Sequence, residues 1–479
     1  MIIVKNSLCV YHKEGFPIWK KKRGTRVWFN LILFGLMGQI AWNVENMYFN
    51  TFLCNYIYGH ASQEAVSGAI SIVDGVSRMV ALSAVTAVVT TFIMGNLSDK
   101  VNNRKFFICG GYILWGLITG CFGFISLDNT EKLFGFSDAA AVLTATVWIV
   151  VAMDCIMTFM GSTSNDSAFN AWITDVTTTE NRTLAETVLA IMPAAAMGIV
   201  LAGGGIVVSK VGYPVFFFIL GGIVILCGII GLFTLKDSRT GKKNTNTNYW
   251  ADLFYGFKPS VVKENSRLYL TFATICIYSI ALQVFFPYII VYLQHSDVDF
   301  MNSISSLLEI KALIPIIILA FAVLAFIIVF VTKSNKFGKE IFVLIAAVLY
   351  AGGLIAAYFA HDAVKFVLCA LPMLAGYAVI GIALNAVIRD FTPEDKTGLF
   401  QGVRMIFYVL IPMVLGPKLC SIASKNSTIS YINDYGAENI LPSSVMFLVA
   451  GITALFVFIP LIVLIKKGME PDKIKECGK

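Results

Sequence analysis

The sequence predicts an all-α membrane protein with about twelve transmembrane helices arranged in two six-helix halves. Hydrophobic residues make up 57% of its 479 residues and charged residues only 14%, too few to cover a water-facing surface of ordinary size. Continuously apolar runs recur along the chain, each near the roughly 20 residues that a helix needs to cross a membrane. A polar stretch divides these runs six and six, and an internal repeat relates the two groups.

The predicted spans are apolar runs of membrane-crossing length. They cover residues 27–57, 66–94, 106–126, 139–164, 187–208, 214–235, 267–293, 312–332, 340–360, 364–389, 399–420 and 444–465. Because each run is long and continuously apolar, rather than short and alternating in polarity, a transmembrane β-barrel is excluded.

The polar stretch contains a Gly-Lys-Lys run and a segment rich in Asn and Thr, a composition typical of a flexible linker. It separates two six-helix bundles, and shorter polar tails flank them. The predicted domains are a basic cytoplasmic tail (1–26), an N-terminal bundle (27–235), a cytoplasmic linker (236–266), a C-terminal bundle (267–465) and a cytoplasmic C-terminal tail (466–479).

The net charge of +7 follows the sides of the membrane and does not gather in one patch. If the N-terminus is cytoplasmic, far more of the 36 Lys and Arg residues lie inside than outside, as the positive-inside rule requires. We therefore expect a multi-pass protein of the plasma membrane with both termini in the cytoplasm. A nucleic-acid partner is not expected, because such partners select a concentrated basic surface.

Reactive motifs are missing from the sequence. The ten cysteines include no CxxC pair, the four histidines have no metal-ligand spacing, and no phosphate-binding GxxxxGK[ST] loop occurs. No histidine-acid pair or G-x-S-x-G turn suggests catalysis within the membrane. We expect no metal, disulfide or cofactor, and we expect that the chain is not an enzyme.

Two segments 215 residues apart indicate a duplication. They read ITDVTTTENRT at 173–183 and IRDFTPEDKTG at 388–398, and at this offset Asp175 matches Asp390. Each segment follows the fourth span of its half, so the repeated unit is a six-helix half.

The loop after the second span, GNLSDKVNNRK at 95–105, resembles the signature loop of the major facilitator superfamily. The matching positions are Gly95, Asp99, Lys100, Arg104 and Lys105. The loop is one residue longer than the usual pattern, and Asn102 stands where glycine is common. The resemblance implies the major facilitator fold, in which two halves rock around a central pathway.

The loop after the fourth span, FNAWITDVTTTENRT at 169–183, is similar to that of the glycoside-pentoside-hexuronide cation symporters, the group of the melibiose carriers. The matching positions are Phe169, Ala171, Asp175, Thr177, Glu180 and Arg182. This resemblance implies a sugar or glycoside substrate. However, Thr91 and Ala87 stand where that family has paired cation-binding aspartates, and Ala190 where it has a sugar-binding arginine, so sodium coupling does not carry over.

These two loops are expected to form a cytoplasmic gate. Each has acidic and basic residues a few positions apart, so ion pairs can form and can break when the halves move. The expected pairs join Asp99 to Arg104 or Lys105, and Asp175 and Glu180 to Arg182. Gly95 and Asp390 complete the predicted gate; the alternative is a solvated loop that only sets the topology.

Polar residues in the first two spans are candidates for the pathway. Gln39, Asn43, Asn46 and Asn50 share one helical face, whereas Glu45 lies off it. In the second span, Asp74 and Arg78 are one turn apart and can pair. Interhelical hydrogen bonding and a structural ion pair are the alternatives to solute binding.

The fourth span carries a stripe that runs towards the cytoplasm. Its members are Asp154, Thr158, Gly161, Asn165 and Trp172, with Asp166 as a further match to an acidic position of the symporters. Carboxylates, amides and an aromatic face together suit a sugar. Alternatively, Asp154 takes up a coupling proton or pairs with Arg78.

The second half is poorer in charge. Its polar candidates within spans are Gln283, Tyr288 and Tyr292, Tyr377 and Asn385, and Gln401 and Arg404. The first half is expected to bind charge or a cation, and the second to orient the solute.

The prediction is thus a secondary transporter of a small polar solute, most simply a sugar or glycoside, working by alternating access as a monomer in contact with membrane lipid. A coupling cation is open, with a proton favoured over sodium. The alternatives are a drug or metabolite exporter of the same superfamily and a membrane sensor that does not transport.

Overall fold

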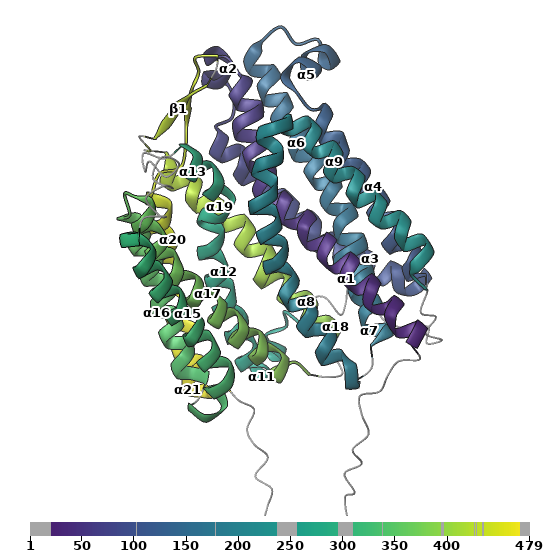
Figure 1. Cartoon of the computed structure of the whole chain (residues 1–479), viewed down its shortest axis with the longest axis vertical. Helices are drawn as coiled ribbons and strands as arrows, with labels where there is room; N and C mark the ends of the chain where they lie inside the picture. Colours follow the sequence, from purple (N-terminus) through teal and green to yellow (C-terminus); the bar gives the residue numbers. More distant parts are fainter. Residues whose placement is uncertain are drawn as a thin grey trace, which may run out of the picture.

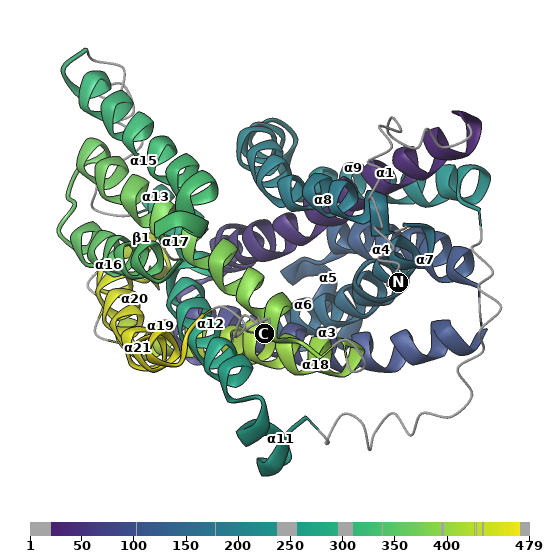
Figure 2. The same cartoon turned by 90° about the horizontal axis from the view of Figure 1, so that it is seen from below.

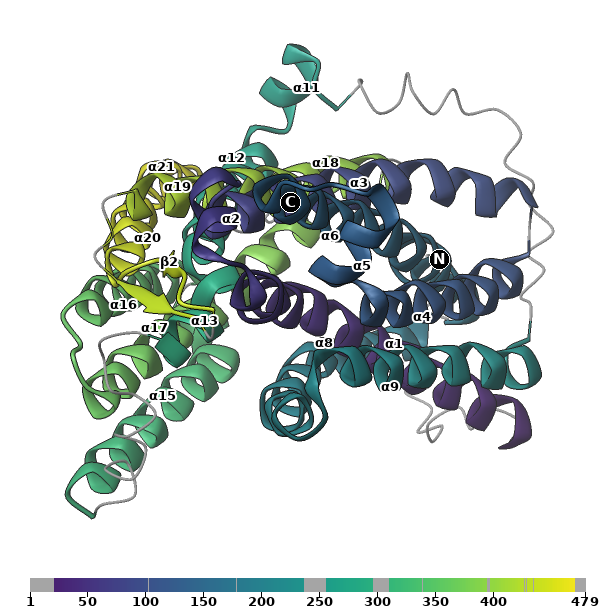
Figure 3. The ribbon, with the colours of Figure 1, turned by 90° about the horizontal axis from the view of Figure 1, so that it is seen from above.

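The computed structural model shows two groups of membrane-length helices side by side (Figure 1). It describes residues 21–101, 103–177, 179–236, 256–295, 310–337, 339–393, 397–425, 427, 429–433 and 435–469. Views along the helices from opposite ends (Figures 2 and 3) show most purple-to-blue helices of the first half on one side and most green-to-yellow helices of the second half on the other, with α19 against α3 where they meet.

The first half contains long helices, interrupted in places by π or 3-10 turns, and two short helices. The long segments are α1 (Lys21–Val44) with η1 (Glu45–Phe49), η2 (Phe52–Ile57) and η3 (Tyr58–His60); α3 (Ile72–Val101); η4 (Phe106–Gly110) with α4 (Gly111–Cys121) and η5 (Phe122–Phe124); α6 (Ala139–Gly161) with η6 (Ser162–Phe169) and α7 (Asn170–Val176); and α8 (Thr179–Ile199) with η7 (Val200–Gly204) and α9 (Gly205–Thr234). The short helices are α2 (Gln63–Gly68) and α5 (Leu127–Phe134).

The second half has a similar series of long helices. Its helices are α11 (Pro259–Glu264); α12 (Ser266–Phe285) with η8 (Phe286–Tyr288) and α13 (Ile289–His295); α15 (Ile310–Phe337); α16 (Lys339–Tyr358); α17 (Ala363–Phe391); α18 (Thr397–Met405) with η10 (Ile406–Leu410) and α19 (Ile411–Ser424); and α20 (Val445–Leu455) with α21 (Phe458–Lys467). Between α19 and α20 lies an antiparallel hairpin of β1 (Ser430–Ile432) and β2 (Glu438–Ile440).

Two sides of the molecule can be distinguished in Figure 1. The hairpin lies at the same end as α2 and α5, whereas α11 and the start of α1 lie at the other. We call these ends the hairpin side and the linker side. The predicted linker falls largely on 237–255, outside the described residues; of the rest, α11 and the start of α12 are helical.

Eleven helices among the described residues are long and apolar enough to cross a membrane. The predicted spans 187–208 and 214–235 both fall on the unbroken run of α8, η7 and α9, of which only α9 is among the eleven. The chain turns within α9 at Gly212, whose φ of 77° favours glycine. The fifth predicted span therefore ends inside α9 and the sixth fills the rest of it.

Small residues let helices of the first half approach closely. A side chain placed on Gly116 of α4 would lie 2.5 Å from the carbonyl oxygen of Gly221 in α9 and 2.7 Å from the backbone nitrogen of Ile225. Such contacts replace the hydrophobic driving force, which is weak between helices that already face lipid.

This contact predicts the effect of one methyl group. Gly116→Ala should lower the melting temperature of the detergent-solubilised protein by on the order of 5 °C, because overpacking costs about 1–3 kcal/mol. Gly120→Ala is the matched control on the same helix, since a Cβ there meets no atom within 4 Å. Equal melting temperatures for the two variants would contradict the close packing of α4 on α9.

Candidate functional site

Three helices of the first half bring a carboxylate and two hydroxyls together in the middle of the bundle. Ser83 of α3 donates to Oε1 of Glu45 over 2.7 Å, and Thr158 of α6 donates to the same oxygen over 3.0 Å. The two hydroxyl oxygens are 2.7 Å apart. Asp154 lies one turn from Thr158 on the same helix, close enough to Ser83 and Glu45 for the two carboxyl groups to influence each other.

This cluster is closed off from its surroundings. Glu45 is 7% exposed and Asp154 2% exposed, and Glu45 Oε2 and Asp154 Oδ1 have no hydrogen-bond partner among the described residues. The charges that act on the pair are acidic as well, because Asp166 acts on Glu45. Two carboxyl groups buried together cannot both be charged at low cost, so the cluster is suited to hold a proton.

The sequence placed only part of this cluster. Asp154 and Thr158 were predicted on one stripe, and the structure keeps them together. Glu45 was expected off the amide face of the first span, and it lies off that face, buried at the start of η1 where it meets Ser83 and Thr158. Ser83 was missed, since a single serine in an apolar helix gives no pattern.

The amides of the first span serve their own helix first. The side chains of Asn43, Asn46 and Asn50 each donate to the carbonyl four residues earlier, that of Asn43 to Gln39. Gln39 and Asn43 are half-buried. The side-chain oxygens of Gln39 and Asn43 therefore remain available to other partners. The predicted stripe is explained in part by these side-chain bonds within the helix.

Two residues of the predicted stripe on the fourth span make structural contacts. Asn165 donates to the hydroxyl of Tyr112 over 2.6 Å, in space that Gly38 leaves open. Trp172 is buried and donates to the carbonyl of Lys236 over 3.4 Å. Asp166 accepts from Ser162 over 3.0 Å.

The second half has a polar group of its own. Arg404 donates to Oδ1 of Asn385 over 2.8 Å, and its guanidinium lies 5.3 Å from the centre of the Tyr408 ring. Gln283 packs against Gly416, and its Oε1 is buried without a hydrogen-bond partner among the described residues. The stacked rings of Tyr278 and Tyr377, with centres 5.0 Å apart, lie in the same half.

On the hairpin side, polar contacts cross between the halves. Asp74 was expected to pair with Arg78; instead it accepts from Ser421 and lies 3.9 Å from Lys418, both on α19. Tyr288 donates to the carbonyl of Val73 over 3.1 Å. These contacts tie α3 to the second half at the point where α3 begins.

The hairpin adds a second set of cross-half bonds. Asn433 donates to the carbonyls of Tyr58 (2.8 Å) and Ala61 (2.7 Å), and Tyr431 donates to that of Cys54 over 2.8 Å. The backbone of Glu438 donates to Gln63 over 2.8 Å. Sequence reasoning missed these residues; the only signal was a short alternating stretch around Gly436, a residue with φ of 76°.

The neighbours of the hairpin continue this contact. Asn55 at the end of the first span donates to Gln294 over 2.8 Å, and its carbonyl oxygen lies 3.2 Å from Nε2 of His295. The imidazole of His295 stacks on the hairpin residue Tyr431, with ring centres 4.3 Å apart. The hairpin side is thus joined across the halves from α3 to the end of α13.

On the linker side, ion pairs form within each half. Arg104 lies 3.3 Å from Asp175 in the first half, and Lys339 lies 3.4 Å from Asp390 in the second. Asp175 and Asp390 are the residues matched by the 215-residue offset, so the duplication extends to their contacts.

Other predicted gate residues give less information. The side chains of Asp99, Glu180 and Arg182 lie outside the described part of the chain, as does that of Gln401, a polar candidate of the eleventh span. Lys105 is half-buried before η4. A Cβ on Gly95 would lie 3.6 Å from Ser167, an ordinary contact, so no close approach requires glycine there.

The described residues contain no candidate metal site. Among those that the structure describes, no three His, Cys, Asp or Glu side chains are grouped as a metal site would need. The functional geometry is therefore that of a buried acidic cluster, a polar group in the opposite half, and contacts that join the halves on one side.

The fold of the chain is similar to that of solved transporter structures. The chain is similar to a mutant of the nucleoside transporter NupG, with 12% identity and a TM-score of 0.59 over 91% of this chain and 99% of that one. It is also similar to a bacterial homolog of the human lysosomal transporter Spinster, inward-facing and unoccupied, with 14% identity and a TM-score of 0.58 over 94% and 98%. The occupied form of that homolog gives 13% and 0.56, over 94% and 97%.

Comparison by sequence identifies a family but no individual curated relative. No curated protein matches the chain, and the melibiose-carrier subgroup is not confirmed. The family profile of the Major Facilitator Superfamily, however, matches residues 27–417, which is most of the chain. With its membrane-length helices and two halves, the protein therefore belongs to the Major Facilitator Superfamily and has the fold of its secondary transporters.

Proposed function

We propose that the protein carries a small polar solute, most simply a sugar or glycoside, across the plasma membrane by alternating access coupled to a proton. The observation that carries the coupling is the buried cluster of Glu45 and Asp154. A charge in the membrane interior is costly and marks function unless a partner neutralises it. Here the neighbouring charges are carboxylates, so a proton is the natural partner.

A proton explains the cluster better than a sodium ion does. Oε1 of Glu45 and the hydroxyl oxygens of Ser83 and Thr158 lie 2.7–3.0 Å from one another, spacings typical of oxygens that share hydrogens and not of oxygens that surround a metal ion. The aspartates that serve sodium in the melibiose carriers have no counterpart at Thr91 and Ala87. Protonation of one carboxyl would remove the repulsion between Glu45 and Asp154 and change how α1 and α6 pack.

The second half is suited to orient the solute. Arg404 and Asn385 offer donors and an acceptor, and Tyr377 and Tyr408 offer aromatic faces. Hydroxyl-rich ligands need both, because their polar edges take hydrogen bonds and their C-H surfaces lie on rings. In the first half, Gln39 and Asn43 keep carbonyl oxygens available on the facing helix.

The two sides of the molecule have different roles in this proposal. The hairpin side faces the cell exterior, both termini are cytoplasmic, and the cross-half bonds of Asp74 and Asn433 close the outer end. The pairs of Arg104 with Asp175 and of Lys339 with Asp390 fix the cytoplasmic loops within each half as it moves. The protein works as a monomer, since one chain contains both halves.

Proton coupling can be tested in proteoliposomes once a solute is known. Glu45→Gln and Asp154→Asn should each lower pH-gradient-driven accumulation at least about tenfold, because a neutral amide cannot carry the proton. Exchange of labelled for unlabelled solute, which needs no net proton movement, should continue. Glu64→Gln, an exposed carboxylate of α2, is the control. Accumulation like that of the wild type in both site variants would refute the coupling site.

The solute class can be identified by thermal stabilisation of the purified protein. The panel contains sugars, glycosides and, because a protein of similar fold transports them, nucleosides, each with and without sodium at two pH values. We expect stabilisation by one hydroxyl-rich class, unaffected by sodium, of about 2.7 kcal/mol at a hundredfold excess over Kd. It should weaken in Arg404→Ala. Indifference to the whole panel would favour an exporter or a sensor.

Closure by the hairpin predicts a change in thiol accessibility. Cys54 is 1% exposed and its carbonyl accepts from the hairpin residue Tyr431. Asn433→Ala removes two bonds across the halves, so a membrane-impermeant maleimide added on the hairpin side should label Cys54 several-fold faster, with Cys54→Ser as the background. Glu438→Gln is the control, because that side chain bonds only within the hairpin to Ser430 among the contacts described. Unchanged labelling in Asn433→Ala would show that the hairpin does not close the pathway.

A further inference from the structure

One face of α3 is exposed from end to end and aliphatic except at its first member. Arg78 begins this face, and the large side chains that follow it are 41–47% exposed. They are Leu82, Val85, Val89, Ile93 and Leu97. Their spacing of three and four residues places them on one side of the helix. An exposed aliphatic stripe on a membrane helix faces lipid, and Arg78 is its only charged member.

The neighbouring helix α6 presents a matching face. Trp148 is 42% exposed, and Ile156 and Phe159 follow it towards the linker side at 43% and 36%. The guanidinium of Arg78 lies over the Trp148 ring, 5.6 Å from its centre. Arg78 and Trp148 therefore stand together at the hairpin-side end of two adjoining lipid-facing stripes.

The level of Arg78 in the membrane follows from the length of α3. The membrane-crossing part of α3 is Ile72–Gly95, and at a rise of about 1.5 Å per residue Arg78 lies about 26 Å from Gly95. In a hydrocarbon layer about 30 Å thick, Arg78 is thus within about one turn of the hairpin-side boundary, and its long side chain can reach the headgroups. Tryptophan also favours this level.

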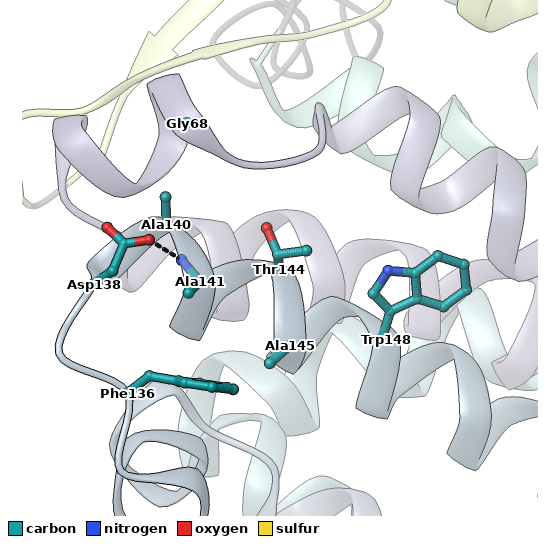
Figure 4. Close-up of a pocket in the computed structure, with 8 residues that line it drawn as sticks. All are labelled: Gly68, Phe136, Asp138, Ala140, Ala141, Thr144, Ala145 and Trp148. Carbon is teal, nitrogen blue, oxygen red and sulfur yellow. Dashed lines mark hydrogen bonds between the residues drawn. The ribbon is translucent and has the colours of Figure 1, made fainter.

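A groove opens on the headgroup side of this pair. It has a volume of about 400 Å³ and lies between α2 and α6. Its lining residues are Gly68, Phe136, Asp138, Ala140, Ala141, Thr144, Ala145 and Trp148. Figure 4 shows Trp148 at one end, the small side chains and Thr144 along the floor, and Asp138 at the far end, where it accepts from the backbone of Ala141 over 2.9 Å.

We propose that this surface binds one glycerophospholipid of the hairpin-side leaflet, with the phosphate on Arg78, the headgroup in the groove and the acyl chains along the stripes below. Arg78 is not used by the proposed transport site. Among the described residues, Arg78 lies over the Trp148 ring and more distantly near Asp74 and the hydroxyl of Tyr58, and Asp74 is bonded to Ser421. A phosphate supplies the anion, and its oxygens match the planar donors of arginine.

The groove is shaped for a headgroup and not for a chain. An acyl chain would run from Arg78 towards the membrane centre, along Leu82 and Ile156, and away from the groove. The alanines keep the groove open beyond Trp148, and the Thr144 hydroxyl can bond a headgroup that carries hydroxyls. Asp138, at the remote end, disfavours a second anion, so a single phosphate fits.

Native mass spectrometry of the purified full-length protein tests this proposal. The probe is palmitoyl-oleoyl phosphatidylglycerol, titrated against the wild type, Arg78→Gln and Ala145→Leu. The wild type should retain one lipid more than either variant does. The abundance of its most tightly bound lipid adduct should fall at least about threefold in Arg78→Gln and in Ala145→Leu. Arg78→Lys should lie between, because lysine keeps the charge without the bidentate geometry.

The controls separate this site from general adhesion. Lys365→Gln removes a cation at the start of α17 that already pairs with Asp362, and it should bind lipid as the wild type does. Palmitoyl-oleoyl glycerol, which has the same chains without the phosphate, should not distinguish wild type from Arg78→Gln. If Arg78→Gln proves polydisperse on size exclusion, Ala145→Leu and Arg78→Lys decide. Equal phosphatidylglycerol retention in the wild type and the well-folded variants would overturn the proposal.

Discussion

The buried carboxylate of Glu45 is the constraint on which the first half depends. It lies where three helices meet, and it is kept there by hydroxyls from two of them. Because a charged group in this setting is far more costly than a hydrogen-bonded neutral one, the protonation of the cluster and the packing of α1, α3 and α6 must be linked. The proton coupling that we propose requires such a link between protonation and the movement of helices.

Much of the fold could be predicted from the sequence, because hydropathy over 20 residues is a local property. Gly212 turns the chain between the fifth predicted span, which ends at residue 208, and the sixth, which begins at residue 214, so the sequence located their division. The limits appear where a side chain finds its partners on other helices. The spacing of Asn43 and Asn46 placed Glu45 off their face, but only the structure identifies Ser83 and Thr158 as its partners.

The contacts between halves could not be predicted, since they join residues more than 200 positions apart. Nothing near Asp74 in the sequence identifies Ser421 and Lys418 as its partners, and the nearby Arg78 was the simpler choice. Asn433 gave no signal either, because its bonds go to the backbone carbonyls of Tyr58 and Ala61, which any residue has. The types of these residues alone do not indicate which distant residues they contact.

The two halves have matching ion pairs in their loops but different polar residues in their interiors. Asp175 and Asp390 occupy matched positions in the two halves, and each forms an ion pair with a basic residue of an earlier loop of its own half. Both halves therefore connect these loops in the same way. Their cores have diverged: carboxylates gather around Glu45 in one, and Arg404 with Asn385 in the other. In the mechanism we propose, this difference lets the first half respond to a proton while the second holds the solute. The loop ion pairs of each half would then carry a local change in charge into movement of that half as a unit.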